Sequence, residues 1–434
     1  MTSGPGGHEA AAARAARRRA LAERWDKLVK EVRGLDGFGG FLSPPRLPGL
    51  LPAAEGGPVV TVNISRWRCD ALLVTRDGAR AVPLPEVTLT AVAERTVAYL
   101  EALHLVDWAA DDLAAARERY EREGSPASVT AYSTAALALH QAVNRREPVL
   151  AALLEWLWDV IAEPVLTALG LVEPRGDDPD PPRLWWCPTG LLTLLPLHGA
   201  GYHAAGDGRT VLDRAVSSYT PTLRALARAR RPAEPRTGKA RMLVVAVPDG
   251  PGQAPLADAA RDRDMLTSRF PGACTLLEGA DATVAAVRAE LARHTWVHFS
   301  CHGDQDLGDP SQGGLALHDD VLRVAEVGVG RHGGEFAFLA ACKTAIGGAA
   351  LPDETITLAA ALHHGGYRHV LGTLWSVRDG IAADVAESVY ADLCSSGSFD
   401  PSQSARALHR ATRSLRDDRR LPPSAWTPFT HTGP

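Results

Sequence analysis

Two short segments of the chain carry the side chains best suited to covalent chemistry. One is Cys301-His302-Gly303-Asp304, and the other is the run Leu339–Ala345, which contains Cys342. A free thiol has a pKa of about 8.5 and is only slightly ionised at neutral pH, but a neighbouring imidazolium lowers that pKa. A Cys–His pair is therefore an activated nucleophile with its own proton donor. In this arrangement His302 would activate Cys342 or protonate a leaving amine.

Gly303 suits the same chemistry because it has no side chain. Without Cβ, its backbone N–H can approach a reacting carbonyl closely, and together with the amide of Cys342 it would form an oxyanion hole. Losing one such donor commonly lowers turnover by about 10²–10³. We therefore predict Gly303 and Cys342 as the oxyanion donors.

Other roles for these residues remain open. Cys301 is a competing nucleophile, but adjacent side chains of a strand point to opposite faces, so it is not expected to face His302. A further alternative is a zinc site with ligands from Cys301, His302, Cys342 and His363 or His364. The six cysteines contain no C-x-x-C pair and no recognised metal spacing, so we expect no metal and no cofactor.

The elements that position these segments follow a regular order in the C-terminal part of the chain. Short apolar runs alternate with helical patterns, which is typical of a mostly parallel sheet covered on both faces. In such sheets, active groups gather beyond the carboxyl ends of the strands. Strands predicted over 295–300 and 336–341 would place His302 and Cys342 side by side at one edge. His298 lies on the same strand face as His302, where we expect a hydrogen-bonded core histidine.

The first part of the chain has a different pattern. Residues 1–33 form an Ala- and Arg-rich helical segment, and two or three antiparallel strands are predicted within 58–83. Long helical patterns follow. Three helices are predicted, over 87–104, 107–123 and 128–170. Prolines disfavour helix interiors, so Pro148 and Pro164 are expected at helix starts or breaks.

Changes in this pattern divide the chain into three parts. The predicted domains are a helical segment over 1–33, an α+β half over 57–230 and a half that carries His302 and Cys342 over 241–434. Within the α+β half, short apolar runs at 184–186 and 191–197 are predicted as strands on either side of a turn at Pro188-Thr189-Gly190.

Composition excludes several classes of protein. Hydrophobic residues make up 45% and charged residues 22%, which is ordinary for a folded globular protein. Lys and Arg total 46 against 51 Asp and Glu, for a net charge of −5, so no nucleic-acid partner is expected. No stretch approaches the roughly 18 apolar residues of a membrane span, and no secretory signal pattern is found. We therefore expect a cytoplasmic protein with no membrane partner.

Several blocks, in order along the chain, resemble the CHAT family of caspase-like cysteine peptidases. These blocks are Pro188–Leu191, Leu195–Ala200, Tyr219–Leu223, Val297–Gly303, Leu339–Ala345, His369–Asp379 and Ala425–Phe429. Further blocks lie at 25–38 and 57–60, so the resemblance covers most of residues 25–434. CHAT domains are often joined to tetratricopeptide repeats, but no period of about 34 residues is found in this sequence.

The resemblance implies specific roles. His302 and Cys342 match the family's catalytic dyad. The implied fold is a caspase-like, mostly parallel sheet of about six strands flanked by helices, with an N-terminal α+β pseudo-subunit. The implied activity is a cysteine endopeptidase that cleaves a protein substrate through a covalent acyl-enzyme. Lys343 departs from the acidic residue common at its position, and a cation beside the thiolate lowers the thiol pKa.

Regulation and biological setting follow from the same resemblance. CHAT peptidases are often silent until a partner protein or ligand rearranges the cleft, and bacterial relatives act in defence and programmed cell death. An activating or recognition partner protein is therefore expected beside the protein substrate. The alternative is a catalytically idle CHAT interaction or scaffold module. The presence of both His302 and Cys342 favours the enzyme.

Substrate choice is also interpreted through the family. In caspase-like peptidases the loop after the last parallel strand helps to wall the substrate pocket, which makes Trp375, Ser376 and Asp379 candidate pocket residues. Asp379 would face a basic side chain or cap the next helix. Ala340 stands where Arg-preferring relatives often carry a carboxylate, which speaks against a basic preference and leaves room for an apolar one. Asp304 would shape the cleft or serve as a turn residue.

Overall fold

The computed structural model describes most of the chain. It covers residues 5–43, 45–176, 178, 180–231, 240–250, 255–306, 308–329, 333–347, 357–377 and 380–434. The chain divides into two compact units, Met1–Leu50 and Leu51–Pro434. The first unit contains the long helix α1, Pro5–Arg33, which occupies the segment predicted as helical.

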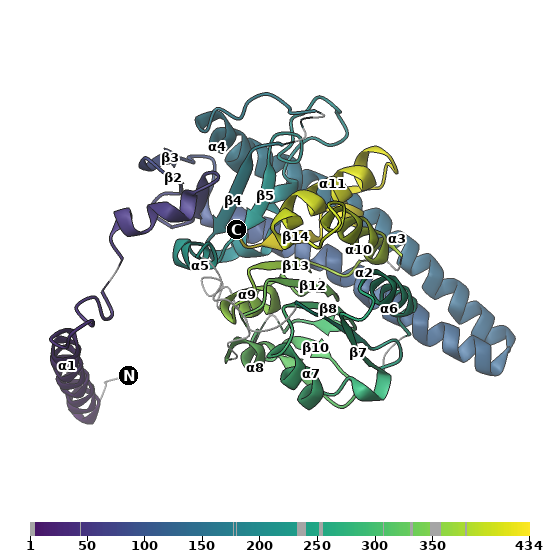
Figure 1. Cartoon of the computed structure of the whole chain (residues 1–434), viewed down its shortest axis with the longest axis horizontal. Helices are drawn as coiled ribbons and strands as arrows, with labels where there is room; N and C mark the ends of the chain where they lie inside the picture. The colour runs from purple at the N-terminus through teal and green to yellow at the C-terminus, as the bar shows by residue number, and fades with distance from the viewer. Residues whose placement is uncertain are drawn as a thin grey trace. The chain divides into compact units, whose positions relative to one another are not determined.

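One sheet of eleven described strands runs through the second unit (Figure 1). Its order is β3-β2-β1-β4-β5-β14-β13-β12-β8-β6-β7. The six strands from β14 to β7 are parallel except for the β13–β14 pair. The predicted mostly parallel sheet of about six strands is therefore confirmed for the half that carries His302 and Cys342. These strands are β6 Met242–Ala246, β7 Cys274–Glu278, β8 Trp296–Ser300, β12 Phe336–Ala340, β13 His369–Thr373 and β14 Phe429–Thr432.

Helices cover both faces of this part of the sheet. They are α6 Ala257–Arg269, α7 Val284–Leu291, α8 Val324–Val329, α9 Leu358–His364, α10 Ile381–Leu393, α11 Ser404–Asp417 and α12 Pro423–Trp426. Val297 and Phe299 pack in one core with residues of α7, α8 and α9. Val244 and Phe338 pack on the other face with residues of α6, α10 and α11. Because strand side chains alternate between faces, near-continuous apolar runs are buried on both.

The N-terminal half joins the same sheet. Its strands are β1 Val59–Asn63, β2 Asp70–Thr75, β3 Gly78–Pro83, β4 Arg183–Pro188 and β5 Val216–Tyr219. β1, β2 and β3 are antiparallel neighbours, as the sequence indicates, and β4 and β5 run parallel to β1. β5 pairs with β14 at Tyr219 and Thr432, so the two predicted halves share one continuous sheet.

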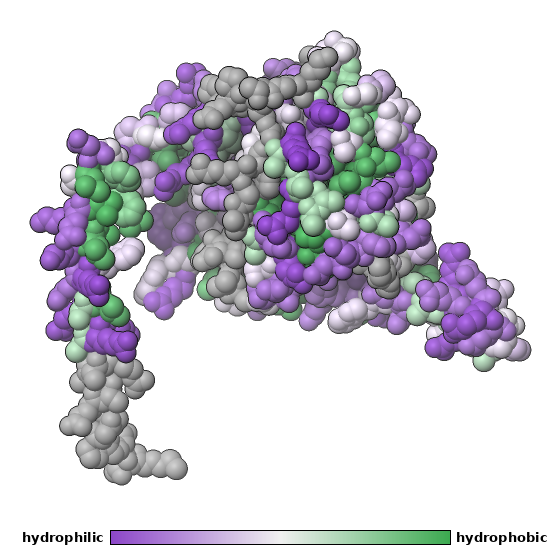
Figure 2. All heavy atoms as spheres, turned by 60° about the horizontal axis from the view of Figure 1, so that its bottom comes forward, coloured by the Kyte–Doolittle hydropathy of each residue, from purple (hydrophilic) through white to green (hydrophobic). Residues whose placement is uncertain are grey.

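Two long helices, α2 Leu89–Glu123 and α3 Pro126–Leu157, form a hairpin that projects from the sheet (Figure 1). The end of the hairpin, at the right of Figure 2, is mainly hydrophilic. The predicted break in the first helix is wrong, because α2 is continuous. Pro148 lies inside α3 and not at a start or break. The helix tolerates it because the turns that follow are buried in the N-terminal core.

One prediction for the region after α3 is confirmed, and another is wrong. Pro164 lies at the start of the short helix α4, Glu163–Ala168. The strand predicted at 191–197 is wrong, because Gly190–Leu194 and Leu197–Gly199 form 3₁₀ turns, in which Leu192, Leu194 and Leu197 are buried. A short apolar run does not by itself distinguish a strand from a buried turn. Helix α5, Leu223–Ala229, follows β5.

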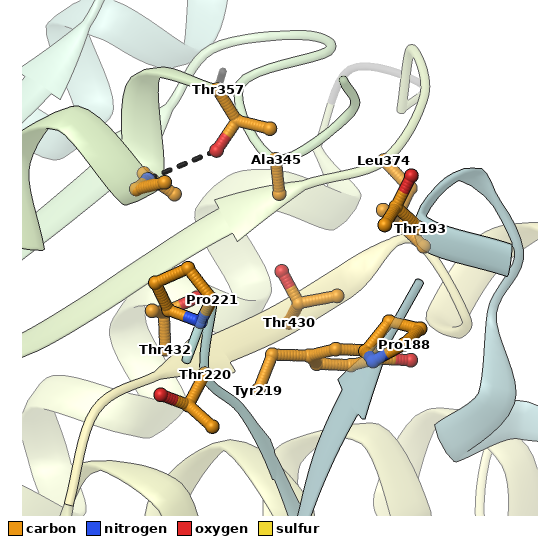
Figure 3. Close-up of a pocket in the computed structure, with 12 residues that line it drawn as sticks. Pro188, Thr193, Tyr219, Thr220, Pro221, Ala345, Thr357, Leu374, Thr430 and Thr432 are labelled. Atoms are coloured by element: carbon orange, nitrogen blue, oxygen red, sulfur yellow. Dashed lines mark hydrogen bonds between the residues drawn. The ribbon is translucent and has the colours of Figure 1, made fainter. Parts of the chain in front are cut away.

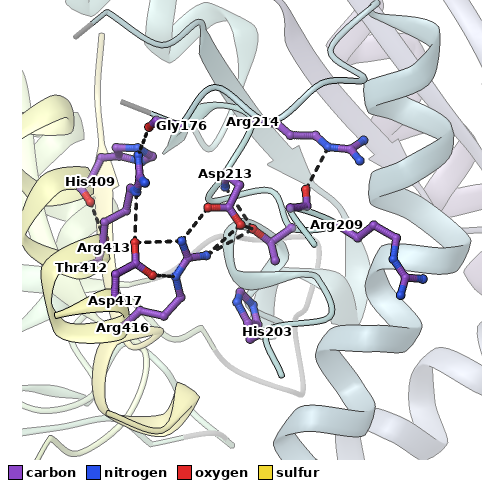
Figure 4. A network of polar contacts seen from close by, with 12 residues as sticks. Gly176, His203, Arg209, Asp213, Arg214, His409, Thr412, Arg413, Arg416 and Asp417 are labelled. Atoms are coloured by element: carbon purple, nitrogen blue, oxygen red, sulfur yellow. Dashed lines mark hydrogen bonds and ion pairs between the residues drawn. The ribbon is translucent and has the colours of Figure 1, made fainter. Parts of the chain in front are cut away.

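Polar contacts tie α11 to the N-terminal half (Figure 4). Arg416 forms a bidentate contact with Asp213, with N–O distances of 2.5 and 3.0 Å. Thr210 donates a hydrogen bond to the same carboxylate at 2.6 Å. Burial acts to raise the pKa of Asp213, but Arg416 and Thr210 lower it overall. A bidentate pair fixes both the distance and the orientation of its two side chains. The Arg416–Asp213 pair therefore holds α11 against the N-terminal half.

Candidate active site

His302 and Cys342 lie at the same edge of the sheet. β8 and β12 are parallel neighbours with Ser300 opposite Ala340, so the residues after them leave the sheet side by side. His302 and Cys342 both line one pocket, together with residues from α6 and α10. The structure thus brings the thiol and the imidazole together at the carboxyl ends of parallel strands, where ligand sites of such sheets form.

A small second sheet holds the segment that follows β8. Its strands are β9 Gly303–Asp304, β10 Gly314–Ala316 and β11 Val321–Arg323, in the order β11-β10-β9. The Ala316 N–H donates to the His302 carbonyl at 2.9 Å, next to the pairing of Leu315 with Gly303. The backbone of His302 is therefore held between β8 and this small sheet.

The backbone around Cys342 is anchored on β13. Thr373 Oγ1 donates to the Ala341 carbonyl at 2.8 Å, and the Thr373 N–H donates to Thr344 Oγ1 at 3.0 Å. The Ala345 N–H donates to the Thr373 carbonyl at 2.8 Å. Thr373 and Thr344 are buried, so these bonds close the turn around Cys342 away from water. One threonine of β13 thus fixes the course of the chain on both sides of the nucleophile.

Gly303 lies against the backbone of Cys342. A Cβ on Gly303 would lie 2.6 Å from the Cys342 carbonyl oxygen and 3.4 Å from its nitrogen. A side chain does not fit at the first of these distances without a shift of the backbone. The close approach supports the argument that this position needs glycine, while the role of the two amides as oxyanion donors stays a prediction.

Burial raises the pKa of the Cys342 thiol above its ordinary value. Hydrogen bonds from the Val377 backbone and the Ser376 side chain act in the opposite direction, because they stabilise the thiolate. Ser376, predicted at the substrate pocket, therefore contacts the nucleophile itself. The resting thiol is mainly protonated at neutral pH, so its activation depends on transfer of the proton to a base such as His302.

Lys343 connects this turn to helix α2. Its ammonium nitrogen lies 3.1 Å from Asp107 Oδ2 and 3.4 Å from Asp304 Oδ1. Burial acts to lower the pKa of Lys343, but the two carboxylates raise it overall. The Lys343 backbone has a φ of 58°, a left-handed conformation that is uncommon for a residue other than glycine. The ion pairs thus hold an unusual turn in place beside the nucleophile.

Cys301 also lines this pocket, but its side chain is buried in the core. Its side chain is 1% exposed and packs with Val297 and Phe299, on the face covered by α7, α8 and α9. Burial raises the pKa of the Cys301 thiol to about 12, so the thiol is protonated at neutral pH. These placements favour Cys342 over Cys301 as the nucleophile.

The other predicted pocket residues have different placements. Ala340 lines the pocket, and Asp379 lies outside the described residues. Trp375 is buried in the core of the N-terminal half, 2% exposed, with its ring 5.8 Å from that of Tyr99 in α2. Its indole N–H donates to the Ser424 carbonyl at 3.1 Å. The Trp375 ring therefore packs in the core of the N-terminal half and does not form a wall of the pocket. Burial in that core removes the large apolar surface of the ring from water.

Asp304, the last of the predicted pocket residues, is at the rim. Its side chain is 83% exposed, and its Oδ1 lies 3.4 Å from the Lys343 ammonium nitrogen. This placement leaves Asp304 accessible to a bound peptide but gives it no part in the buried pocket.

Two acidic residues of this region were not singled out from the sequence. Asp107 contacts Lys343 from α2, and Asp262 of α6 lines the pocket. Asp107 has no local signal, since it is one of many charged residues on a long helix. Asp262 has one: it falls between Ala259 and Leu266 at the spacing of the buried face of α6.

The described residues do not support the zinc alternative. Among them, no group of three or more His, Cys, Asp or Glu is placed to hold a metal ion. His363 Nδ1, near the end of α9, lies 3.0 Å from the carbonyl oxygen of Tyr367, which follows that helix. In the same described part of the chain, no helix is both long and apolar enough to cross a membrane.

A separate cavity lies where the two halves of the sheet meet (Figure 3). Tyr219 and Pro221 line it from the N-terminal half, and Thr430 and Thr432 line it from β14. Its described lining contains no thiol, imidazole or carboxylate. We therefore assign no chemistry to this cavity.

The fold and the site together define an α/β protein with a Cys–His pair at the ends of neighbouring parallel strands. The model of the CHAT domain family matches residues 151–434. The chain therefore belongs to the CHAT family, as its sequence motifs predict. A sequence comparison with curated proteins gives no match.

Several solved structures are similar to this chain at low sequence identity. Separase of Saccharomyces cerevisiae, in its complex with securin, gives a TM-score of 0.53 at 11% identity, over 88% of this chain and 30% of that chain. A second structure of that complex gives 0.54 at 12% identity, over 89% and 30%. The Arg-specific cysteine proteinase gingipain R gives 0.43 at 11% identity, over 67% and 75%. The fold is caspase-like, and the chain spans 30% of the separase chain that it matches.

Proposed function

We propose that this protein is a cysteine endopeptidase that acts through Cys342 and His302. The Cys342 sulfur attacks a peptide carbonyl carbon, and the electron pair of the C=O bond moves to oxygen as the S–C bond forms. His302 accepts the thiol proton and passes it to the leaving amine as the C–N bond breaks. Water, with His302 as its base, then hydrolyses the thioester and releases the thiol and a carboxylate.

One observation carries this proposal: Cys342 and His302 line the same pocket beyond β8 and β12. The close approach of Gly303 to the Cys342 backbone is what a site with two converging amide donors requires. Membership of the CHAT family and the caspase-like fold support the same class of reaction.

A regulatory partner is part of the proposal. Separase is seen in a complex with securin, and in this chain a contact between α2 and Lys343 lies next to the nucleophile. A partner protein or ligand that moves α2 would change the turn that carries Cys342. We place the cleavage of a protein substrate in a defence or programmed-death response, on the strength of the family resemblance.

The second candidate is a catalytically idle interaction module. It is favoured by the burial of the Cys342 thiol, which raises the thiol pKa and leaves the resting thiol protonated. An idle module needs no reactive thiol, whereas a peptidase does. The reactivity of Cys342 therefore separates the two candidates.

Cleavage of a peptide library by the full chain tests the peptidase. We expect Cys342→Ala and His302→Ala to remove cleavage, and Cys301→Ala, the matched control, to retain it. Iodoacetamide should label Cys342, located by mass spectrometry, with loss of cleavage in proportion. Cleavage by the Cys342→Ala protein at the rate of the parent contradicts the mechanism. No cleavage, together with a Cys342 thiol that reacts no faster than a buried thiol, favours the idle module.

A further inference from the structure

Helix α1 carries a stripe of exposed apolar side chains. Leu21, Trp25 and Leu28 are 58%, 58% and 48% exposed, and Val32 is half-buried. Their spacing alternates between four and three residues, which places them along one side of the helix. Single exposed apolar residues are ordinary on a protein surface, but a continuous stripe is typical of an interaction surface.

The compact unit that contains α1 has no core to cover this stripe. Among the described side chains of Met1–Leu50, none is buried and none belongs to a buried apolar cluster. In proteins, most of the stability of a helix comes from packing of its apolar face and not from the propensities of its residues. The stripe on α1 therefore requires a partner surface outside this unit.

The stripe has the pattern of a coiled coil. In a coiled coil, apolar side chains repeat at positions a and d of a heptad, and the flanking positions e and g set the choice and the orientation of the partner. Trp25 and Val32 take position a, and Leu21 and Leu28 take position d. Arg18 stands at the next a position toward the N-terminus, so the apolar seam ends at Leu21.

The residues beside the seam complement those of a second copy in the antiparallel orientation. Position g is occupied by Arg24 and Glu31, and position e is occupied by Ala22 and Val29. In an antiparallel pair, the g positions of the two helices face each other, and so do the e positions. Arg24 of each copy then faces Glu31 of the other, and Ala22 faces Val29. One side of the seam thus pairs opposite charges, and the other side pairs apolar groups.

The side chains of the seam favour the same orientation. In the antiparallel pair, Trp25 lies opposite Leu28 of the second copy, and Leu21 lies opposite Val32. Each layer then combines a larger side chain with a smaller one, which is the arrangement that fills a core without voids. A parallel pair would place two Trp25 rings in one layer and would leave the g-position charges without opposite partners.

We propose that α1 binds a second copy of this chain as an antiparallel two-helix coiled coil, with a seam of Leu21, Trp25, Leu28 and Val32. The same surface is used on both copies, as in twofold dimers generally. The seam spans about two heptads, so the contact is small. We therefore expect a reversible dimer, with a dissociation constant in the micromolar range. This inference does not depend on the peptidase function.

The mass of the full chain in solution is the first test. Sedimentation equilibrium over a wide range of protein concentration should show a rise from the mass of one chain to that of two. Leu28→Glu places a charge in the seam and is expected to raise the dissociation constant by about 10²-fold or more. Lys27→Glu is the matched control, because it places the same side chain on the opposite face of α1. A dimer that persists in Leu28→Glu uses another surface and overturns the proposal.

The charged positions test the orientation. Arg24→Glu and Glu31→Arg each place like charges opposite one another, and each is expected to weaken self-association by about tenfold. The double variant restores opposite charges and should dimerise as the parent does. A mixture of the two single variants should form a mixed dimer, because every facing pair is then of opposite charge. Self-association that is unchanged in both single variants overturns the antiparallel register.

A parent chain that is monomeric at every concentration also overturns the proposal, and the melting temperature then shows what covers the stripe. If Leu28→Glu melts at a lower temperature than Lys27→Glu, the stripe packs on the rest of the same chain. If the two variants melt alike, the stripe is left for a different protein. Both results contradict the dimer.

Discussion

The two halves of the sheet place different residues at equivalent positions. In the C-terminal half, the segments beyond β8 and β12 carry His302 and Cys342, which line a pocket. In the N-terminal half, β4 ends at Pro188 and continues into 3₁₀ turns with buried leucines. The carboxyl end of a parallel strand thus carries candidate reactive residues in one half and packing residues in the other. The sheet topology creates the position at the carboxyl end of a strand, and the type of residue there determines whether it packs in a core or faces a pocket.

The N-terminal half nevertheless supports the site through contacts in both directions. Trp375 of the C-terminal half packs in the N-terminal core against Tyr99. Asp107 of the N-terminal half pairs with Lys343, next to the nucleophile. If the C-terminal half supplies the chemistry and the N-terminal half supports it, substitutions in the two halves should affect different quantities. Substitutions at the site should mainly lower kcat/KM, and substitutions at the contacts between the halves should mainly lower the free energy of unfolding.

Apart from Cys342 and His302 themselves, the largest effect is expected at Gly303. Gly303→Ala places a Cβ 2.6 Å from the Cys342 carbonyl oxygen and displaces an amide next to the nucleophile. We expect kcat/KM to fall by about 10²–10³. Gly328→Ala is the control, since its Cβ would lie 3.9 Å from the nearest atom. Full activity in a Gly303→Ala protein with an unchanged melting temperature would show that the close approach is not needed.

Trp375 tests the contact between the halves. Trp375→Ala is expected to lower the free energy of unfolding by about 3–5 kcal/mol, measured in urea, because it leaves a cavity in the N-terminal core. Tyr99→Phe is the control. The Tyr99 hydroxyl is buried without a hydrogen-bond partner, so its removal should cost less than about 1 kcal/mol or stabilise the fold. A Trp375→Ala protein with unchanged stability and altered substrate preference would return Trp375 to the pocket.

Ser376 tests the electrostatics of the nucleophile. Burial raises the pKa of Cys342, and the Ser376 side chain lowers it by stabilising the thiolate. Ser376→Ala should therefore raise the thiol pKa further. The rate of iodoacetamide alkylation rises with pH as the thiolate forms, and its midpoint should move to higher pH. A midpoint that stays in place or moves to lower pH contradicts this role. Ser395→Ala, on an exposed turn remote from the pocket, is the control.

The smallest effect is expected at Asp107. Asp107→Asn removes one of the two carboxylates that pair with Lys343, and both partners are partly exposed. We expect kcat/KM to change by less than about fivefold and the free energy of unfolding by about 1 kcal/mol or less. The difference from the parent should shrink in 0.5 M salt, as expected for a screened pair. Asp111→Asn, an exposed position one turn further along α2, is the control. A loss as large as that at Gly303 would place Asp107 within the chemistry.

Much of the fold follows from local patterns. Alternating apolar runs and helical periods indicate the parallel part of the sheet, and the order of motifs identifies the family. The errors arise where local pattern is ambiguous. The run at 191–197 is apolar but forms buried turns, and Pro148 lies inside a helix that tertiary packing stabilises. Both are cases in which packing outweighs propensity.

The same distinction between local pattern and tertiary packing applies to the candidate site. Cys342 and His302 are found from the sequence because their residue types are rare and their positions follow recognisable strands. Ser376 is found as a neighbour of the site, although its contact with the thiol is not foreseen. Trp375 is misplaced because nothing within its loop shows which core its ring enters.

The sequence by itself therefore determined the candidate reactive residues, Cys342 and His302, and the sheet edge at which both lie, since residue type and hydrophobic period are properties of the local chain. Tertiary structure alone decided the surroundings of those groups. Asp262 is one charged residue of a surface helix until α6 packs on β8 and buries it beside Ser300. Contacts between segments far apart in the chain depend on how helices seat on the sheet, and no local pattern encodes them.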